Sequence, residues 1–188
     1  GINDRLTGLP PADIFLDRVD QAIISSRREK SKIAMFLINL DRFALINHGL
    51  GRETGDEVLK AVSARLRQAF RESDTISRIG GDTFGLLIRV TEETHSAIVA
   101  EKVLQTIARP VSVGGQEIVV TASIGIASCH DTGDGADKIM GFAESAMHHA
   151  KAMGGKTYQF FDSNLNESAK KRIEMENSLR NAVRQEEF

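Results

Sequence analysis

The stretch Arg78-Ile79-Gly80-Gly81-Asp82-Thr83-Phe84 decides the fold of this chain. It joins residues 75–79 to residues 84–90, two short segments with the composition of strands. The two glycines can adopt the positive φ values that a tight turn requires. The stretch therefore predicts a hairpin, with Asp82 and Thr83 directly after the turn glycines.

The segments upstream of this hairpin predict one buried strand and three helices. Residues 33–40 form a nearly continuous apolar run, which is typical of a central strand buried on both faces. Residues 10–30 and 54–70 carry apolar side chains at helical spacing, and residues 41–47 predict a short helix that ends near two glycines. The apolar positions of the two long helices are Ile14, Phe15, Val19, Ala22 and Ile23, then Val58, Leu59, Val62, Leu66 and Phe70.

The downstream segments complete a mixed architecture. Because strands and helices do not alternate regularly along the chain, the order is not that of a doubly wound fold. We expect an α/β (α+β) sandwich in which helices surround a central mixed β-sheet. The downstream elements are a helix at 92–108, a hairpin of 111–113 with 117–127 around Gly114-Gly115, a helix at 136–153, a strand at 156–161 and a polar helix at 163–186.

The composition is that of a single globular domain. The chain has 188 residues, of which 41% are hydrophobic and 27% charged, and its net charge of -2 predicts neither a nucleic-acid partner nor membrane contact from this domain. No apolar run approaches the roughly 18 residues that a membrane span needs. One cysteine, Cys129, excludes a disulfide framework and a zinc cluster. We expect a cytoplasmic domain cut from a longer protein, and whether that protein carries a membrane anchor outside these residues stays open.

Six separated stretches resemble a known family. They follow one another in register from residue 4 to residue 161, which is far more specific than a Gly-Gly-Asp hairpin alone. The chain resembles the GGDEF family, the diguanylate cyclases and their degenerate relatives. This resemblance implies a nucleotide-cyclase, palm-like fold over residues 1–162. The stretches are Asp4-Arg5-Leu6-Thr7-Gly8-Leu9-Pro10, Asn39-Leu40-Asp41-Arg42-Phe43 with Ile46-Asn47, Gly55-Asp56, Arg78-Ile79-Gly80-Gly81-Asp82-Thr83-Phe84, Thr121-Ala122-Ser123-Ile124-Gly125-Ile126-Ala127, and Ala143-Glu144-Ser145-Ala146-Met147 with Ala150-Lys151.

The family's metal-binding and catalytic positions are altered in this chain. A cyclase joins two GTP molecules by attack of a ribose 3′-hydroxyl on an α-phosphate, and divalent cations neutralise the charge. The resemblance places Mg²⁺ ligands at Asn39, Leu40 and Asp41 and in the hairpin at Asp82. Asn39 replaces a family aspartate, and Thr83 replaces the second acid of the signature. Asp41 would partly compensate if the strand continued through it, so a weakly active cyclase using Asp82 and Asp41 is the enzyme alternative.

Two of three basic phosphate contacts are also replaced. The resemblance assigns phosphate binding to Lys151, but Ala44 and Gly155 stand where the family has a lysine and an arginine. Lys156 is near enough in sequence to substitute for the arginine. Each loss of a charge-stabilising group costs roughly 10²–10³-fold in rate, so we expect no cyclase activity and Mg²⁺ only where a nucleotide binds.

The positions that recognise guanine in the family are retained. Asn47 and Asp56 match them, and an amide with a carboxylate suits the hydrogen-bonding edge of that base. The resemblance therefore implies that GTP still binds without reacting. The structural alternative is that Asn47 caps a turn and Asp56 opens a helix, since both residue types favour such positions.

A second nucleotide site is implied just before the hairpin. Arg71 and Asp74 form an RxxD motif at the offset of the family's inhibitory cyclic di-GMP site, and Lys102 matches a further basic residue of that site. A guanidinium can bind phosphate or stack on guanine, while a carboxylate accepts from the base. The alternative is a surface ion pair of little energetic consequence.

The last segment, 163–188, resembles the helix that links a GGDEF domain to a following EAL phosphodiesterase domain. Its charge-rich sequence has a narrow apolar stripe, and we interpret Lys170-Lys171-Arg172 as a solvated helix face. The leading hypothesis is a non-catalytic regulatory domain of bacterial signalling that binds GTP or cyclic di-GMP and regulates an EAL domain in the same polypeptide. A ligand-free dimerisation or interaction scaffold is a further alternative, and a homodimer stays open.

Overall fold

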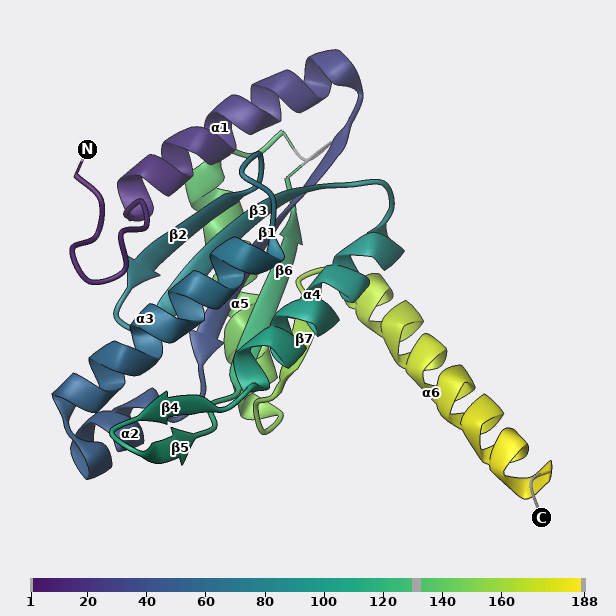
Figure 1. Ribbon diagram of the computed structural model, residues 1–188. Helices are drawn as coiled ribbons and strands as arrows, with labels where there is room; N and C mark the ends of the chain where they lie inside the picture. Colours follow the sequence, from purple (N-terminus) through teal and green to yellow (C-terminus); the bar gives the residue numbers. More distant parts are fainter. Residues whose placement is uncertain (1, 130–132, 187–188) are drawn as a thin grey trace.

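The computed structural model describes residues 2–129 and 133–186 and contains the expected mixed sheet (Figure 1). Its five strands follow the order β2-β3-β1-β6-β7, in which only β6 and β7 pair in parallel. The ends of the two expected domain ranges, residue 1 and residues 187–188, lie outside the described residues. The elements are α1 (Ala12–Glu29), β1 (Lys32–Leu40), α2 (Phe43–Leu50), α3 (Arg52–Ala69), β2 (Thr75–Gly80), β3 (Thr83–Val90), α4 (Glu93–Ala108), β4 (Val111–Val113), β5 (Gln116–Ile118), β6 (Ala122–Ser128), α5 (Ala136–Ala152), β7 (Thr157–Phe160) and α6 (Ser163–Glu186).

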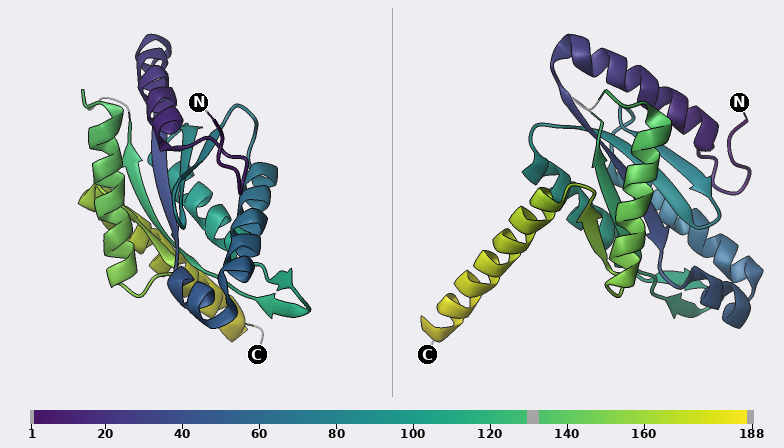
Figure 2. Two further views of the ribbon diagram at one scale, coloured as in Figure 1. Left: turned by 90° about the vertical axis from the view of Figure 1, so that its left-hand side faces the viewer. Right: turned by 180° about the vertical axis from the view of Figure 1, so that it is seen from behind.

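The central strand β1 is buried on both faces because its side chains alternate between two helical layers. One set packs with α1 and α5, and the other packs with α3 and α4. Figure 2 shows α5 and α3 on opposite sides of the sheet. The first set is Ile33, Met35 and Leu37, and the second is Ala34, Phe36, Ile38 and Leu40.

Most predicted elements are confirmed, but the strand expected at 117–127 is wrong. The chain there forms two strands: β5 pairs with β4 in a separate two-stranded sheet, and β6 joins the main sheet beside β1. Residues 119–121 connect β5 in the small sheet to β6 in the main sheet. Because all of them favour extended backbone, local sequence gives no sign of this change of partner. The short helix α2 also begins later than expected, at Phe43, and runs past Gly49.

The C-terminal helix α6 is held to the domain only through its first half. The Asn166 side chain bonds both backbone groups of Phe160, at 2.6 and 2.7 Å, and Leu165 and Ala169 pack against the main core. Every side chain from 173 to 184 is exposed, and α6 projects from the body of the domain (Figures 1 and 2). No helix within 2–129 or 133–186 has the length and apolar character for a membrane crossing.

Helix α5 lies against β6 at Gly125, where only a glycine fits. A Cβ there would lie 1.9 Å from the Ala143 carbonyl oxygen and 2.4 Å from the Met147 nitrogen, and both are backbone atoms. The helix therefore approaches the sheet backbone to backbone at this point.

We expect Gly125→Ala to lower the free energy of unfolding by roughly 1–3 kcal/mol or more, because α5 must move away from the sheet. The matched control is Gly141→Ala, an exposed position in α5 with open space around it. This substitution should raise stability by up to about 1 kcal/mol through helix propensity. Urea denaturation of both variants gives the comparison, and equal stabilities would contradict the close approach.

Candidate nucleotide-binding sites

The turn of the β2–β3 hairpin lies beside the end of β1, and a buried amide joins them. Asn39 stands opposite Thr83 in the β1–β3 register and is 8% exposed. Its Nδ2 donates to Asp82 Oδ1 at 3.1 Å and to Thr83 Oγ1 at 2.9 Å. The Leu40 N–H donates to the Asp82 carbonyl oxygen at 3.1 Å. Four expected site residues, from β1 and from the hairpin, therefore come together.

The donor set of this cluster does not fit a pair of magnesium ions. Mg²⁺ binds charged oxygen ligands, and among Asn39, Asp82 and Thr83 only one side chain is a carboxylate. The amide hydrogens of Asn39 point at the oxygens that a cation would contact. Within the described part of the chain, no group of three or more His, Cys, Asp or Glu side chains could hold a metal ion.

Strand β1 ends at Leu40, as the apolar run predicts, so the condition under which Asp41 would compensate for Asn39 is not met. The Asp41 carboxylate instead accepts hydrogen bonds from Thr121 Oγ1 at 2.7 Å, Ser123 Oγ at 2.6 Å and the Lys156 N–H at 2.9 Å. Burial opposes ionisation of Asp41, but these hydrogen bonds and a nearby lysine outweigh it and hold its pKa below the ordinary value. The recorded side-chain contacts of Asp41 are to Thr121 and Ser123 around the start of β6, to Lys151 of α5 and to Lys156 before β7, and none is to the Asn39 cluster.

The same carboxylate holds the expected phosphate-binding lysine. Lys151 Nζ lies 3.5 Å from Asp41 Oδ1. Gly155 has a φ of 74°, and a Cβ there would lie 2.8 Å from Asp41 Oδ2, so the family's arginine does not fit this backbone. Lys156 supplies its backbone N–H to Asp41.

Asn47 and Asp56 lie at the corner between α2 and α3. Both are inside helices rather than at their starts, and neither α2 nor α3 has a side-chain N-cap, so the capping alternative is wrong. Asn47 Oδ1 is buried and has no hydrogen-bond partner among the described residues. It lies over Gly55, where a Cβ would be 1.8 Å away. Asp56 follows Gly55 directly in α3. Its backbone is therefore next to the residue that Asn47 Oδ1 contacts.

Arg71, Asp74 and Lys102 line one pocket of about 650 Å³. The Arg71 N–H donates to Asp74 Oδ2 and the Asp74 N–H donates to the Arg71 carbonyl oxygen, both at 3.0 Å, so the RxxD motif is a closed turn. Lys102 Nζ donates to the Ala69 carbonyl oxygen at 2.5 Å and lies 4.8 Å from the Phe70 ring centroid. The Arg71 guanidinium has no recorded ion pair within the described ranges, so the surface-ion-pair alternative fails.

Sequence reasoning missed three further basic residues of this pocket. Arg18 of α1, Arg89 of β3 and His95 of α4 also line it. They come from separate elements and form no local motif. One hint of these residues was present in the sequence, which is the arginine within the apolar segment of β3. This residue, Arg89, is the one exposed position of that strand. Its Nη1 lies 2.5 Å from Glu29 Oε2 of α1.

A family model described as "Diguanylate cyclase, GGDEF domain" matches residues 2–157. The chain belongs to the GGDEF family. The structure agrees with this, since the GGDEF domain of TpbB (YfiN) from Pseudomonas aeruginosa superposes with a TM-score of 0.82 at 28% identity, covering 89% of this chain and 99% of that one.

Two curated relatives of this GGDEF domain are larger proteins of Pseudomonas aeruginosa. The bifunctional diguanylate cyclase/cyclic di-GMP phosphodiesterase MucR is 37% identical over 182 residues, which are 97% of this chain and 27% of MucR. The cyclic di-GMP phosphodiesterase NbdA is 33% identical over 185 residues, 98% of this chain and 24% of NbdA. The chain thus spans about a quarter of the length of these relatives, and it is a domain of cyclic di-GMP signalling.

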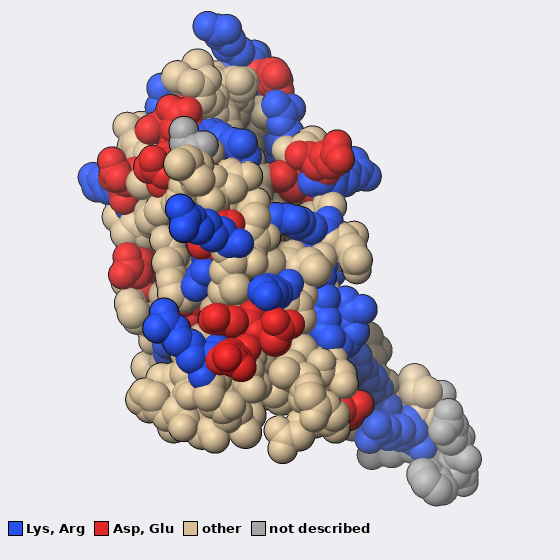
Figure 3. All heavy atoms as spheres, turned by 60° about the vertical axis from the view of Figure 1, so that its left-hand side comes forward, with Lys and Arg blue, Asp and Glu red and all other residues tan. Residues whose placement is uncertain are grey.

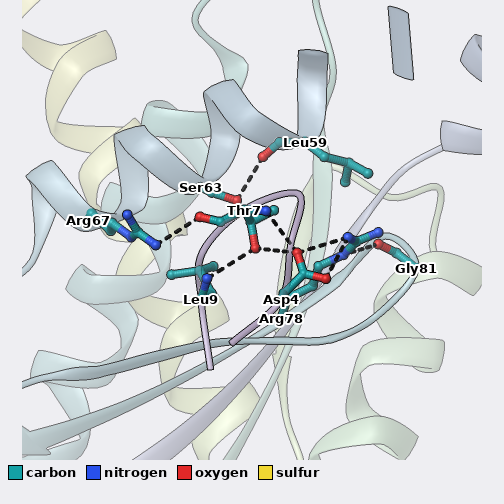
Figure 4. Close-up of polar contacts among 8 residues, drawn as sticks. All are labelled: Asp4, Thr7, Leu9, Leu59, Ser63, Arg67, Arg78 and Gly81. Atoms are coloured by element: carbon teal, nitrogen blue, oxygen red, sulfur yellow. Dashed lines mark hydrogen bonds and ion pairs between the residues drawn. The ribbon is translucent and has the colours of Figure 1, made fainter. Parts of the chain in front are cut away.

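The N-terminal motif of the GGDEF domain is tied to the signature hairpin (Figure 4). Asp4 Oδ2 accepts from the Thr7 hydroxyl at 2.6 Å and the Thr7 N–H at 2.9 Å, and Arg78 Nη1 lies 3.1 Å from the same oxygen. Arg78 Nε also donates to the Gly81 carbonyl oxygen at 2.9 Å, and Arg67 Nη2 donates to the Thr7 carbonyl oxygen at 2.8 Å. Burial raises the pKa of Asp4, but the bonds from Thr7 and Arg78 outweigh it and lower the pKa overall.

We expect Asp4→Asn to lower the free energy of unfolding at pH 7 by roughly 1–3 kcal/mol, because hydrogen bonds to a charged group are lost. Since the pKa of Asp4 is lowered on folding, its stabilisation is present above the unfolded value of about 3.9 and is lost as pH falls through the folded value.

The difference between wild type and Asp4→Asn should therefore shrink as the pH falls below about 4, as measured by urea denaturation at several pH values. Asp17→Asn, at an exposed position of α1, is the control and should change little. A difference that stays constant over this pH range would contradict the charge argument.

Proposed function

We propose that this GGDEF domain is a non-catalytic receptor for cyclic di-GMP that regulates an EAL phosphodiesterase domain in the same polypeptide. The observation that carries the proposal is the pocket in which Arg71, Asp74 and Lys102 come together. Its volume of about 650 Å³ lies within the range usual for small-ligand sites, roughly 300–1,000 Å³.

The charges of the pocket suit a cyclic dinucleotide. The ligand has two phosphates and two guanine bases. The pocket offers Arg18, Arg71 and Lys102 against one lining acid, Asp74, while Arg89 is paired with Glu29. A guanidinium can fork onto a phosphate or stack on a base, and a carboxylate accepts from the guanine N–H groups. This positive charge is local. On the face shown in Figure 3, basic and acidic side chains are interspersed, so no broad basic surface favours nucleic acid there.

We expect Arg71→Ala to weaken cyclic di-GMP binding by about 10- to 100-fold, because a charged hydrogen-bond donor is removed from the pocket. Isothermal titration calorimetry of this domain measures the change. The control is Arg180→Ala, which removes the same side chain from the exposed half of α6. No binding by the wild type would contradict the proposal and favour the ligand-free scaffold, and an unchanged affinity of Arg71→Ala would move the site elsewhere.

The second part of the proposal is that the domain makes no cyclic di-GMP. Supporting it are the single carboxylate among Asn39, Asp82 and Thr83, and the pairing of Lys151 with Asp41. We therefore propose that Mg²⁺ is not a resident cofactor and arrives only with a nucleotide.

With GTP and either Mg²⁺ or Mn²⁺, product should form at least about 10⁴-fold more slowly than with an intact cyclase, since two charged groups are missing from the metal site. The relative named diguanylate cyclase TpbB, 31% identical over 151 residues, serves as the positive control. Chromatography of the reaction detects the product. Turnover that disappears in Asp82→Ala would establish the weakly active cyclase instead.

GTP is a second candidate ligand, at the α2–α3 corner. The specific observation is the buried Asn47 Oδ1, which lacks a hydrogen-bond partner among the described residues. An unsatisfied buried acceptor is costly, and a ligand donor would remove that cost. Asp56 beside it supplies a carboxylate for the guanine N–H groups. Weak phosphate contacts limit the affinity, so GTP remains secondary to cyclic di-GMP in this proposal.

The EAL partner is proposed from the relatives and from α6. MucR is named as both cyclase and phosphodiesterase and NbdA as a phosphodiesterase, and each is far longer than this chain. The exposed half of α6 suits a connection to a neighbouring domain. Self-association into a homodimer stays a prediction.

A further inference from the structure

Helix α4 has three faces, each with a different neighbour. Its core face packs under the sheet through fully buried residues. A second face lines the cyclic di-GMP pocket, and its residues recur at the three- and four-residue spacing of one helix stripe. The residues of the core face are Ala100, Val103 and Ile107, and those of the pocket face are His95, Ile98, Val99 and Lys102.

The third face of α4 contacts α6. Thr94 and Ala97 line a small cavity there together with Leu165 and Ala169 of α6. One helical turn further on, Glu101 Oε1 accepts from Arg172 Nη2 at 3.0 Å. Glu101 is the direct neighbour of Lys102, so consecutive residues of one helix face the ligand pocket and the C-terminal helix.

The Glu101–Arg172 ion pair is where α6 leaves the domain. Arg172 is the last partly buried side chain of α6 between 163 and 184, and its side chain is 26% exposed. The expectation that residues 170–172 form a solvated face therefore fails for Arg172. Tyr158 of β7 is buried close to this pair. Its burial raises the pKa of its hydroxyl most, and the charge of Glu101 raises it further. Helix α6 begins beside α4 and projects away from the domain (Figure 1).

Arg172 has two acidic neighbours, and both contacts are present in the structure at the same time. Its Nη2 pairs with Glu101 of α4, and its Nε lies 3.8 Å from Glu176 Oε1 of its own helix. If the Glu101 contact were broken, α6 would no longer be tied to α4 here, and Arg172 would keep Glu176 as its acidic neighbour. Coupling between sites requires such an element with two discrete states that a ligand can bias.

We infer that α4 passes the state of the cyclic di-GMP pocket to α6 through the Glu101–Arg172 pair. This inference rests on the proposed binding of cyclic di-GMP at Arg71, Asp74 and Lys102. A bound phosphate draws Lys102 away from the Ala69 carbonyl oxygen and displaces α4, and packed helices shift by about 1–2 Å in such transitions. Glu101 moves with α4, so its contact with Arg172 breaks and Arg172 keeps Glu176. The exposed half of α6 extends about 18 Å beyond Arg172, so a small tilt there becomes a larger displacement at its end.

The test measures binding and α6 position in the same protein. Nitroxide labels at Lys60→Cys of α3 and Arg180→Cys of α6 report the distance between the domain and the projecting helix by pulsed electron paramagnetic resonance. The native Cys129 is 1% exposed, and burial raises its pKa to about 12, so we expect labelling at the two introduced cysteines. Calorimetry on the labelled protein gives the affinity for cyclic di-GMP.

Cyclic di-GMP should shift the α3–α6 distance distribution in the wild type. Glu101→Gln should bind with an affinity within about twofold of wild type and show no shift, and Glu101→Asp, which keeps the carboxylate, should still show the shift. The control Glu174→Gln removes one charge from α6 at an exposed position and should respond like wild type.

Each other outcome has one meaning. Binding without a shift in the wild type, or with the full shift in Glu101→Gln, overturns this inference and leaves the proposed receptor function intact. No binding at all overturns the proposed function, and the inference falls with it.

Discussion

The burial of β1 between two helical layers is the constraint on which the rest of this structure depends. Six consecutive residues from Ile33 to Ile38 alternate between two apolar environments, and the polar side chain that follows them, Asn39, appears where the strand reaches the edge of the core. A buried amide needs hydrogen-bond partners. It finds them in Asp82 and Thr83, because antiparallel pairing with β3 brings the hairpin to the same edge.

That pairing also explains how the fold persists at an altered family site. In an acidic cluster, two carboxylates would repel one another unless a cation lay between them. Here the amide of Asn39 donates to both hairpin residues, so the corner is satisfied by hydrogen bonds alone. Asp41 is similarly satisfied, by two hydroxyls, a backbone N–H and Lys151. The altered residues thus form a self-consistent polar edge on an ordinary GGDEF core.

The parts of the structure that sequence could predict are those that local pattern determines. The apolar run of β1 and the helical spacing of α3 follow from periodicity, and six motifs in register indicated the family. The grouping of Arg71, Asp74 and Lys102 came from the resemblance and is found in one pocket. The remaining features depend on partners distant in the chain. Arg89 enters the pocket from β3, Arg172 meets Glu101 across 71 positions, and Asp41 turns toward Thr121 only because β1 ends one residue earlier.

The close approach at Gly125 makes the two faces of the sheet mechanically unequal. On the α5 side the helix backbone touches the strand, so sliding meets an immediate steric barrier. On the α4 side, contact is made through alanine, valine and isoleucine side chains, and layers packed in this way can shear by small rotamer changes. We therefore expect α5 to resist sliding over the sheet more strongly than α4 does. A larger side chain at Gly125 would push two backbones apart, whereas a changed side chain in α4 would first meet other side chains.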